Sequence, residues 1–196
     1  MKLENKKIAI LATDGFEKSE LFQPLEALQA QGASITIISD KLGEIKSWDK
    51  NNWGKSINVD LEITKASIDN FDALLLPGGV INPDMLRIND SALTFVRSCV
   101  LKGKTVAAIC HAPWLLINAG VAKGKRLTSY KSIKEDLINA EAHWEDSPVV
   151  VDKNLVTSRN PKDIPVFIEK FIENIIAVKS KPSVLKSMNS TPPEKE

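Results

Sequence analysis

Three short apolar runs constrain the fold of this chain more than any other feature of its sequence. They are KKIAILAT at residues 6–13, FDALLLPGG at 71–79 and KTVAAIC at 104–110. None shows the alternation of apolar and polar residues that is typical of a strand with one exposed face. Continuous runs of this length are typical of parallel strands that are buried on both faces of a sheet.

Segments with helical periodicity separate these runs. Helices are expected at residues 19–32, 89–103, 112–120 and 161–178. Other strands are expected at 33–39, within an excursion at 40–60 whose return strand is placed at 57–63, and in a hairpin at 147–159. Pro24 either kinks the first helix or marks its true start. Strands that alternate with helices predict an α/β fold, a mostly parallel sheet covered on both faces.

Length and charge limit the domain organisation and the kinds of partner. The 196 residues fit one domain, which we place at residues 1–178. Residues 179–196 are polar and contain three prolines, so we expect a disordered tail. The net charge of +1 offers no field that attracts nucleic acid or a membrane surface, and no apolar run is long enough to span one. We therefore expect a small-molecule or protein substrate.

Two cysteines, Cys99 and Cys110, are too few for a disulfide framework, and we expect free thiols in a cytoplasmic protein. The N-terminal apolar stretch is too short for a signal peptide. Two cysteines and two histidines show no ligand spacing, so no metal site is expected.

Chemically reactive side chains follow the three apolar runs. They lie in DGFE at residues 14–17, in Gly78-Gly79 and in Cys110-His111. In open α/β sheets, ligands bind outside the carboxyl ends of the strands. If the three strands are parallel neighbours, these residues converge at one edge of the sheet.

The sequence around Cys110 indicates a nucleophile elbow, a sharp strand-to-helix turn that exposes a reactive side chain. Ala108 and Ala112 flank Cys110 at a distance of two residues, where larger side chains would crowd the turn. Such a turn places the thiol at a helix N-terminus, which favours the thiolate. A lone cysteine is more often a buried structural residue, and that interpretation is retained for Cys99.

Other roles follow from position relative to the elbow. The residue after the nucleophile, His111, offers its backbone N–H to an oxyanion, and Gly79 can supply a second donor. The alternative for Gly79 is a plain tight turn. A Cys110–His111 nucleophile–base pair is conceivable, although such pairs usually come from distant positions. Glu17 is the candidate acid, against the alternative of a solvated glutamate at a helix start, which fits Glu20 better.

His143 and Glu145 superficially match the His-x-Glu pair that completes glutaminase triads. They lie only about thirty residues beyond Cys110, and short motifs match often by chance. We interpret the segment as a strand end and do not favour the glutaminase hypothesis.

Read together, several segments resemble the ThiJ/PfpI superfamily, and in particular its PfpI branch of intracellular proteases and general stress proteins. The segments are KIAILATDGFEKSEL, DALLLPGG, AAICHAPWLL, GKRLTSY, INAEAHWEDSPVVVD and LVTSRNPKDIPVF, in order between about Lys6 and Ala177. The resemblance implies a flavodoxin-like three-layer sandwich. It implies that Cys110 is the nucleophile, Glu17 the acid beside the thiol, and Gly79 and His111 the oxyanion hole.

The resemblance also implies further site residues. In PfpI-type oligomers an acidic residue of a neighbouring subunit orients the histidine after the nucleophile, and Asp84 matches that position, although the family residue is usually Glu. Tyr130 matches a residue near the family pocket, and Trp114 is placed where it narrows the pocket. Ala112 departs from the glycine that many relatives have there.

The implied activity is a cofactor-free attack of a thiolate on a carbonyl, as in peptidases, glyoxalases and deglycases of stress protection. The expected substrates are small carbonyl compounds, peptides or glycated proteins, and the expected assembly is a homodimer or higher homo-oligomer. The alternative is an oxidation-sensing or chaperone-like protein with little turnover, because a reactive thiol also oxidises readily.

Overall fold

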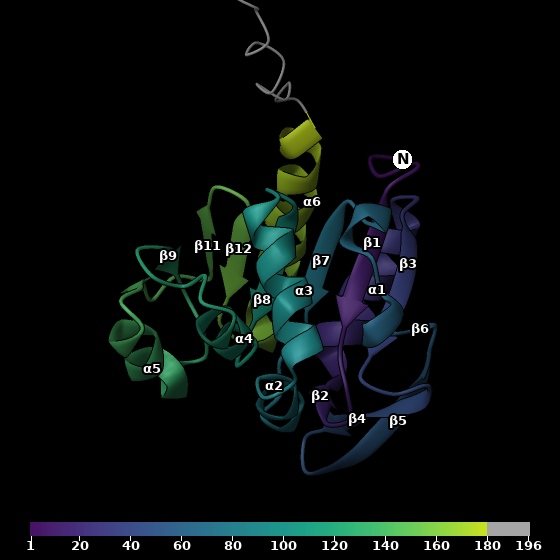
Figure 1. The fold of residues 1–196 in the computed structure, drawn as a ribbon, viewed down its shortest axis with the longest axis horizontal. Coiled ribbons are helices and arrows are strands. Elements are labelled where there is room, and N and C mark those ends of the chain that lie inside the picture. The colour runs from purple at the N-terminus through teal and green to yellow at the C-terminus, as the bar shows by residue number, and fades with distance from the viewer. Residues whose placement is uncertain (180–196) are drawn as a thin grey trace, which may run out of the picture.

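A computed structural model describes residues 1–179, and the expected disordered tail at 179–196 lies almost wholly outside them. Figure 1 shows the arrangement of the elements. The strands are β1 (Lys7–Leu11), β2 (Phe16–Glu17), β3 (Ser34–Ser39), β4 (Gly43–Asp49), β5 (Asn52–Val59), β6 (Leu61–Glu62), β7 (Ala73–Leu76), β8 (Thr105–Ile109), β9 (Arg126–Leu127), β10 (His143–Trp144), β11 (Val149–Asp152) and β12 (Leu155–Ser158).

Helices connect most of these strands. They are α1 (Lys18–Ala30), α2 (Ile81–Leu86), α3 (Asp90–Leu101), α4 (Pro113–Asn118), α5 (Lys134–Asn139) and α6 (Ile164–Lys179), with short 3₁₀ turns η1 (Ile63–Lys65), η2 (Ile68–Asn70), η3 (Lys131–Ile133) and η4 (Pro161–Asp163). Asn89 is the N-cap of α3, since its side chain accepts a hydrogen bond from the amide of Ala92.

The main sheet of residues 1–179 has the strand order β11-β12-β8-β7-β1-β3-β6. Every pairing in it is parallel except that of β11 with β12. The three apolar runs therefore form adjacent parallel strands, in the order β8-β7-β1. Their carboxyl ends meet at one edge of the sheet, as the sequence predicts.

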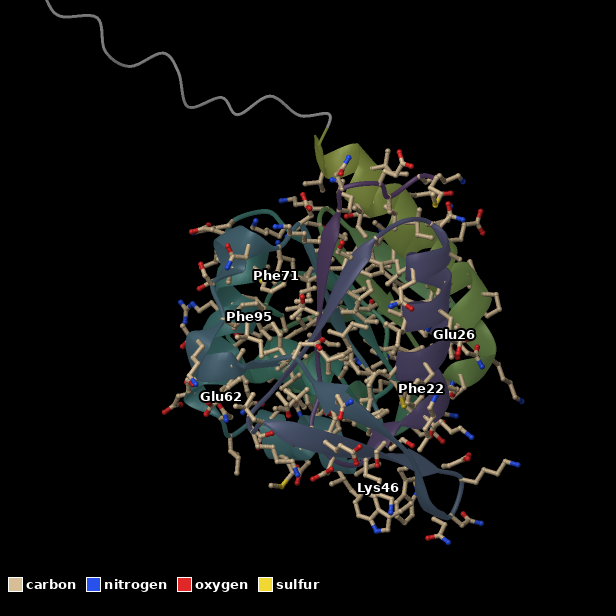
Figure 2. All side chains as sticks on the ribbon, turned by 90° about the vertical axis from the view of Figure 1, so that its right-hand side faces the viewer. Phe22, Glu26, Lys46, Glu62, Phe71 and Phe95 are labelled. Atoms are coloured by element: carbon tan, nitrogen blue, oxygen red, sulfur yellow. The ribbon has the colours of Figure 1, made fainter. Side chains whose placement is uncertain are left out.

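Helices cover both faces of this sheet, so the fold is a three-layer α/β sandwich. Along β7, Leu74 and Leu76 face the core that α3 and α4 cover. Ala73 and Leu75 face the opposite core, which α1 and α6 cover. In Figure 2, the labelled Phe71 and Phe95 lie on the α3 side and Phe22 on the α1 side. Burial on both faces explains why the strand sequences do not alternate.

The excursion at 40–60 is an antiparallel hairpin of β4 and β5, with β2 pairing in parallel with β4. Trp48 and Trp53 stand opposite each other across it, with ring centroids 5.4 Å apart in an edge-to-face arrangement. The return strand is Asn52–Val59, so the expectation of residues 57–63 was placed too late along the chain. The hairpin at 147–159 is confirmed as β11 and β12.

Two features of the helices differ from the sequence prediction. Helix α1 begins at Lys18, so Pro24 lies inside it and does not mark its start. The six-residue helices α2 and α5 were not predicted, because both are too short to show a helical period. Within residues 1–179, no helix combines the length and apolar character that a transmembrane span requires.

Candidate active site

Cys110 occupies a strained turn between β8 and α4. Its φ is +64°, in the left-handed region that a non-glycine residue rarely adopts. Ala108 and Ala112 are fully buried on either side. Ala112 has a φ of −57°, so this position needs no glycine. The nucleophile elbow predicted from the sequence is therefore present.

Two backbone donors and one imidazole surround the sulfur of Cys110. The amides of Gly79 and His111 hydrogen-bond the sulfur, and each lowers the pKa of the thiol. Burial outweighs them and raises that pKa, since the residue is only 6% exposed. Nδ1 of His111 lies 3.1 Å from Sγ. The ring as well as the backbone of His111 thus faces the thiol.

The carboxyl beside the thiol belongs to Glu20. This side chain is fully buried, and its Oε2 accepts a hydrogen bond of 2.9 Å from the amide of Gly78. The carboxyl also interacts with the Cys110 thiol, and Oε1 makes no hydrogen bond of ordinary geometry within residues 1–179. Burial, followed by the negative charge of Glu17, raises the pKa of Glu20 from 4.5 to about 8. At neutral pH this group is mainly a protonated acid.

Glu17, the acid expected from the sequence, is the N-cap of helix α1. Its side chain accepts hydrogen bonds from the amide and hydroxyl of Ser19, at 3.4 and 3.0 Å, and so caps the N-terminus of α1. The interpretation of Glu20 as a solvated residue is wrong. The sequence did contain a sign that Glu20 is buried. Glu20 lies on the same face of α1 as the buried residues Leu21, Pro24 and Leu28.

The imidazole of His111 is packed between two aromatic rings. Tyr130 stacks on it at 4.9 Å and 24°, and Trp114 meets it edge-on at 5.3 Å. Its second nitrogen, Nε2, lies 3.0 Å from the hydroxyl of Ser132. Burial lowers the pKa of the imidazole, so the ring is neutral at neutral pH. Ser132 escaped sequence reasoning because nothing local distinguishes it from any loop serine.

Within the described residues of one chain, Asp84 is not a partner of the His111 ring. It is exposed on α2, and the structure shows no hydrogen bond or ion pair between it and His111 within residues 1–179. Trp114 instead interacts with Asp136, whose Oδ2 accepts its indole N–H at 2.7 Å, and with the guanidinium of Arg87, 4.7 Å above its ring. Tyr130 and Trp114 both lie against the His111 ring.

His143 and Glu145 lie at the end of β10, which pairs with β9 outside the main sheet. Glu145 is paired with Arg126, and neither His143 nor Glu145 makes a hydrogen bond or ion pair with Cys110 within residues 1–179. The segment is a strand end, and a glutaminase triad is not formed.

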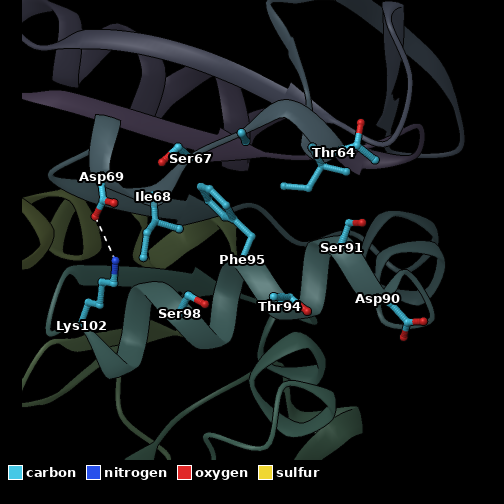
Figure 3. Close-up of a pocket in the computed structure, with 12 residues that line it drawn as sticks. Thr64, Ser67, Ile68, Asp69, Asp90, Ser91, Thr94, Phe95, Ser98 and Lys102 are labelled. Carbon is cyan, nitrogen blue, oxygen red and sulfur yellow. Dashed lines mark hydrogen bonds and ion pairs between the residues drawn. The ribbon is translucent and has the colours of Figure 1, made fainter.

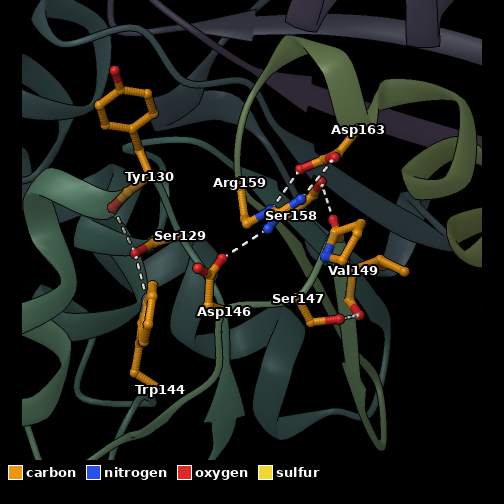
Figure 4. A network of polar contacts seen from close by, with 10 residues as sticks. Ser129, Tyr130, Trp144, Asp146, Ser147, Val149, Ser158, Arg159 and Asp163 are labelled. Carbon is orange, nitrogen blue, oxygen red and sulfur yellow. Dashed lines mark hydrogen bonds and ion pairs between the residues drawn. The ribbon is translucent and has the colours of Figure 1, made fainter.

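A polar network supports the same edge of the sheet. Figure 4 shows Arg159 between Asp146 and Asp163, with hydrogen bonds of 2.7 Å to the first and 2.9 Å to the second. The preceding residue, Ser158, accepts the backbone hydrogen bond of Cys110 at 3.0 Å. The network thus holds the end of β12, to which the backbone of Cys110 is hydrogen-bonded.

One groove is separate from this site. A groove of about 570 Å³ lies between α3 and the η1–η2 segment, where Lys102 pairs with Asp69 at 3.0 Å (Figure 3). Its lining includes none of the residues around Cys110. In the described residues, no group of three or more His, Cys, Asp or Glu side chains is placed to hold a metal ion.

Comparison with known proteins identifies the family of this chain. A model of the DJ-1/PfpI family matches residues 6–174. The chain belongs to this family. Among relatives, Deglycase PfpI of Pyrococcus furiosus is 41% identical over 167 residues, covering 85% of this chain and 98% of that protein. Protein/nucleic acid deglycase 2 of Escherichia coli is 44% identical over 164 residues, covering 83% and 94%.

A third relative and two solved structures agree with the family assignment. General stress protein 18 of Bacillus subtilis is 42% identical, covering 83% of this chain and 93% of that protein. Drosophila melanogaster DJ-1beta superposes with a TM-score of 0.78 at 30% identity, covering 88% of this chain and 95% of that one. A two-domain Anabaena variabilis protein with DJ-1/ThiJ/PfpI-like and ferritin-like domains gives 0.83 at 34% identity, over 87% of this chain and 48% of that one.

Proposed function

We propose that this protein is a cofactor-free, cysteine-dependent deglycase that removes carbonyl adducts from the amino groups of proteins. The observation that carries the proposal is the environment of Cys110 Sγ, where an imidazole nitrogen at 3.1 Å and two backbone N–H groups converge. That combination suits addition of sulfur to a carbonyl. The names of two relatives, each more than 40% identical, support the deglycase assignment.

His111 is the base in this mechanism. Its ring is neutral and its Nδ1 faces the thiol, so it takes the thiol proton as sulfur approaches the substrate. The new bond joins Sγ to the carbonyl carbon, and the π electrons of the carbonyl move to its oxygen. The amides of Gly79 and His111 stabilise that oxyanion.

Glu20 is the acid. Because its pKa is raised to about 8, it holds a proton at neutral pH and can donate it to the oxyanion or the departing amine. For a methylglyoxal adduct, departure of the amine frees the aldehyde carbonyl, and sulfur adds to it. A proton then moves from that carbon to the neighbouring ketone carbon, which turns the hemithioacetal into a thioester of lactate. Water hydrolyses the thioester and returns the Cys110 thiol. For a methylglyoxal adduct the balance is adduct plus water giving free amine plus lactate, with no external oxidant or reductant.

The burial of Cys110 favours a slender substrate group. With the residue 6% exposed, a carbonyl at the end of an extended side chain reaches the sulfur more readily than a peptide bond within a folded backbone. A glycated lysine or arginine meets this requirement. The same burial supports turnover over oxidation sensing, since sensor thiols have a low pKa and are accessible.

We further propose a cytoplasmic location and a homodimer or higher homo-oligomer. A reducing compartment agrees with two free cysteines, Cys99 and Cys110. The segment around Asp84 exposes Val80, Met85 and Ile88, at 55%, 53% and 78%, which supports coverage by a second subunit.

A substrate panel tests the deglycase proposal. Wild-type protein is incubated with a methylglyoxal-modified peptide, a methylglyoxal-modified nucleotide, free methylglyoxal and the unmodified peptide. We expect release of free amine and lactate from the modified peptide at the highest kcat/KM. Cleavage of the unmodified peptide bond, with the adduct left intact, would identify a peptidase and overturn the proposal.

A further inference from the structure

The imidazole of His111 is held at both of its nitrogens. Nδ1 lies 3.1 Å from Cys110 Sγ, and Nε2 lies 3.0 Å from the hydroxyl of Ser132. Within residues 1–179, the structure shows no carboxylate in hydrogen-bonding contact with this ring. Within the described residues, the hydrogen-bonding partner of Nε2 is therefore an uncharged hydroxyl.

The segment that carries Ser132 is anchored to the elbow at two points. The amide of Tyr130 donates a hydrogen bond of 2.8 Å to the carbonyl of Cys110, and the Tyr130 ring stacks on His111. A 3₁₀ turn then begins at Lys131, closed by the amide of Ile133 on the carbonyl of Tyr130 at 3.2 Å. The turn presents the Ser132 hydroxyl to Nε2.

We infer that Ser132 is a positioning residue that keeps the proton of neutral His111 on Nε2 and leaves Nδ1 free to accept the proton of the Cys110 thiol. The stacked Tyr130 ring fixes the plane of the imidazole. A hydroxyl can donate or accept a hydrogen bond, and the thiol proton that faces Nδ1 leaves it the role of acceptor for Nε2–H. This inference rests on the role that the proposed function gives to His111.

A hydroxyl in this position has a different consequence from a carboxylate. It accepts the Nε2–H hydrogen bond without adding a negative charge, so it does not favour the imidazolium. Burial is accordingly the cause of the lowered pKa of His111. Arg87 and Asp136 contact Trp114, the ring that meets His111 edge-on.

Alkylation of Cys110 by iodoacetamide tests the inference without any substrate. Ser132 is exposed, so Ser132→Ala is expected to fold normally, which its unfolding midpoint checks. The rate of alkylation at neutral pH, followed by intact mass, should fall about 10-fold in Ser132→Ala, the loss expected for one hydrogen bond. Ser132→Thr should restore the rate, and Ser91→Ala, an exposed serine on α3, is the matched control.

A double mutant separates positioning from a general structural effect. In the His111→Gln background, Ser132→Ala should change the alkylation rate by less than about twofold, because its target is already removed. A 10-fold loss in that background, or an unchanged rate in the single variant, would overturn the inference. An equal loss in Asp84→Asn, together with a rate that falls on dilution, would show that a carboxylate of a second subunit orients the ring instead.

Steady-state kinetics on a glycated peptide separates the positioning role of Ser132 from the proposed deglycase activity. With a glycated peptide, Ser132→Ala should lower kcat with KM within about twofold of wild type, since Ser132 contacts His111 and not the substrate. If no glycated substrate is consumed while the alkylation effect holds, the deglycase proposal fails and the positioning role stands.

Discussion

Glu20 and Cys110 lie so close together that a single methyl group added at Gly78 would stand 2.6 Å from both Cys110 Cβ and Glu20 Oε2. The residues are ninety positions apart in the chain. They meet because α1 follows β1, and the elbow follows β8, at the same edge of the sheet. Gly78, after β7, is the spacer that lets the carboxyl reach the thiol, and its amide holds the carboxyl in place.

Replacing Glu20 should cost far more activity than replacing Glu17. Glu20→Gln removes the proton donor beside Cys110, and kcat on a glycated peptide should fall about 10²-fold or more. Glu17→Gln keeps a side-chain oxygen that caps α1, so kcat should stay within about threefold. Steady-state kinetics of the two variants checks this, and the reverse order of losses would return the acid role to Glu17.

The raised pKa of Glu20 makes stability depend on pH. The pKa is about 8 in the folded protein and 4.5 ordinarily, so the folded state binds this proton more tightly. Its contribution to stability is fully present below pH 4.5 and is lost as the pH rises through 8. From pH 5 to 8, wild type should lose on the order of a few kcal/mol relative to Glu20→Gln.

Urea unfolding of the two proteins at both pH values measures this difference. Other titrating groups are common to both proteins and cancel in the comparison. Parallel pH profiles for wild type and Glu20→Gln would contradict a protonated Glu20.

Gly78→Ala should disturb the site directly. The added Cβ would also stand 2.6 Å from the carbonyl oxygen of Ile109, which is backbone and cannot move aside cheaply. We expect a loss of about 1–3 kcal/mol in the free energy of unfolding, with most of the activity. Gly103→Ala is the control. It has a φ of +72° but nothing within 4 Å of the added Cβ, so it should lower stability and leave kcat nearly unchanged.

The stack of Tyr130 on His111 predicts a difference between two substitutions. Tyr130→Phe keeps an aromatic ring at the 4.9 Å separation and should retain most of kcat/KM. Tyr130→Ala removes the ring and frees the imidazole to rotate, so kcat/KM should fall about 10-fold. Equal kinetics for the two variants would show that the stack does not orient His111.

The elbow and the sheet edge could be predicted because both depend on short, continuous stretches of sequence. Continuous apolar runs predict buried parallel strands, and Ala108 and Ala112 indicate the turn around Cys110. The order β8-β7-β1 then brings the three loops together. Sequence position alone was enough to predict that Cys110, His111 and Gly79 lie close together.

The acid and the orienting hydroxyl required three-dimensional information. Choosing between Glu17 and Glu20 depends on where α1 begins, and helix ends are uncertain by a residue or two from sequence. Because the helix begins at Lys18, Glu17 caps it and Glu20 turns toward the sheet. Ser132 approaches His111 from twenty-one residues away through a loop, which no periodicity marks.

The central claim is that Cys110 is the nucleophile that meets the carbonyl, and two cysteine variants test it most directly. Cys110→Ala and Cys99→Ala are compared with wild type for release of lactate and free amine from a methylglyoxal-modified peptide. Cys99 lies on α3 and its side chain is buried in the core, so its variant controls for loss of a thiol. We predict that Cys110→Ala loses all detectable release while Cys99→Ala keeps it. Release at the wild-type rate by Cys110→Ala would contradict the account.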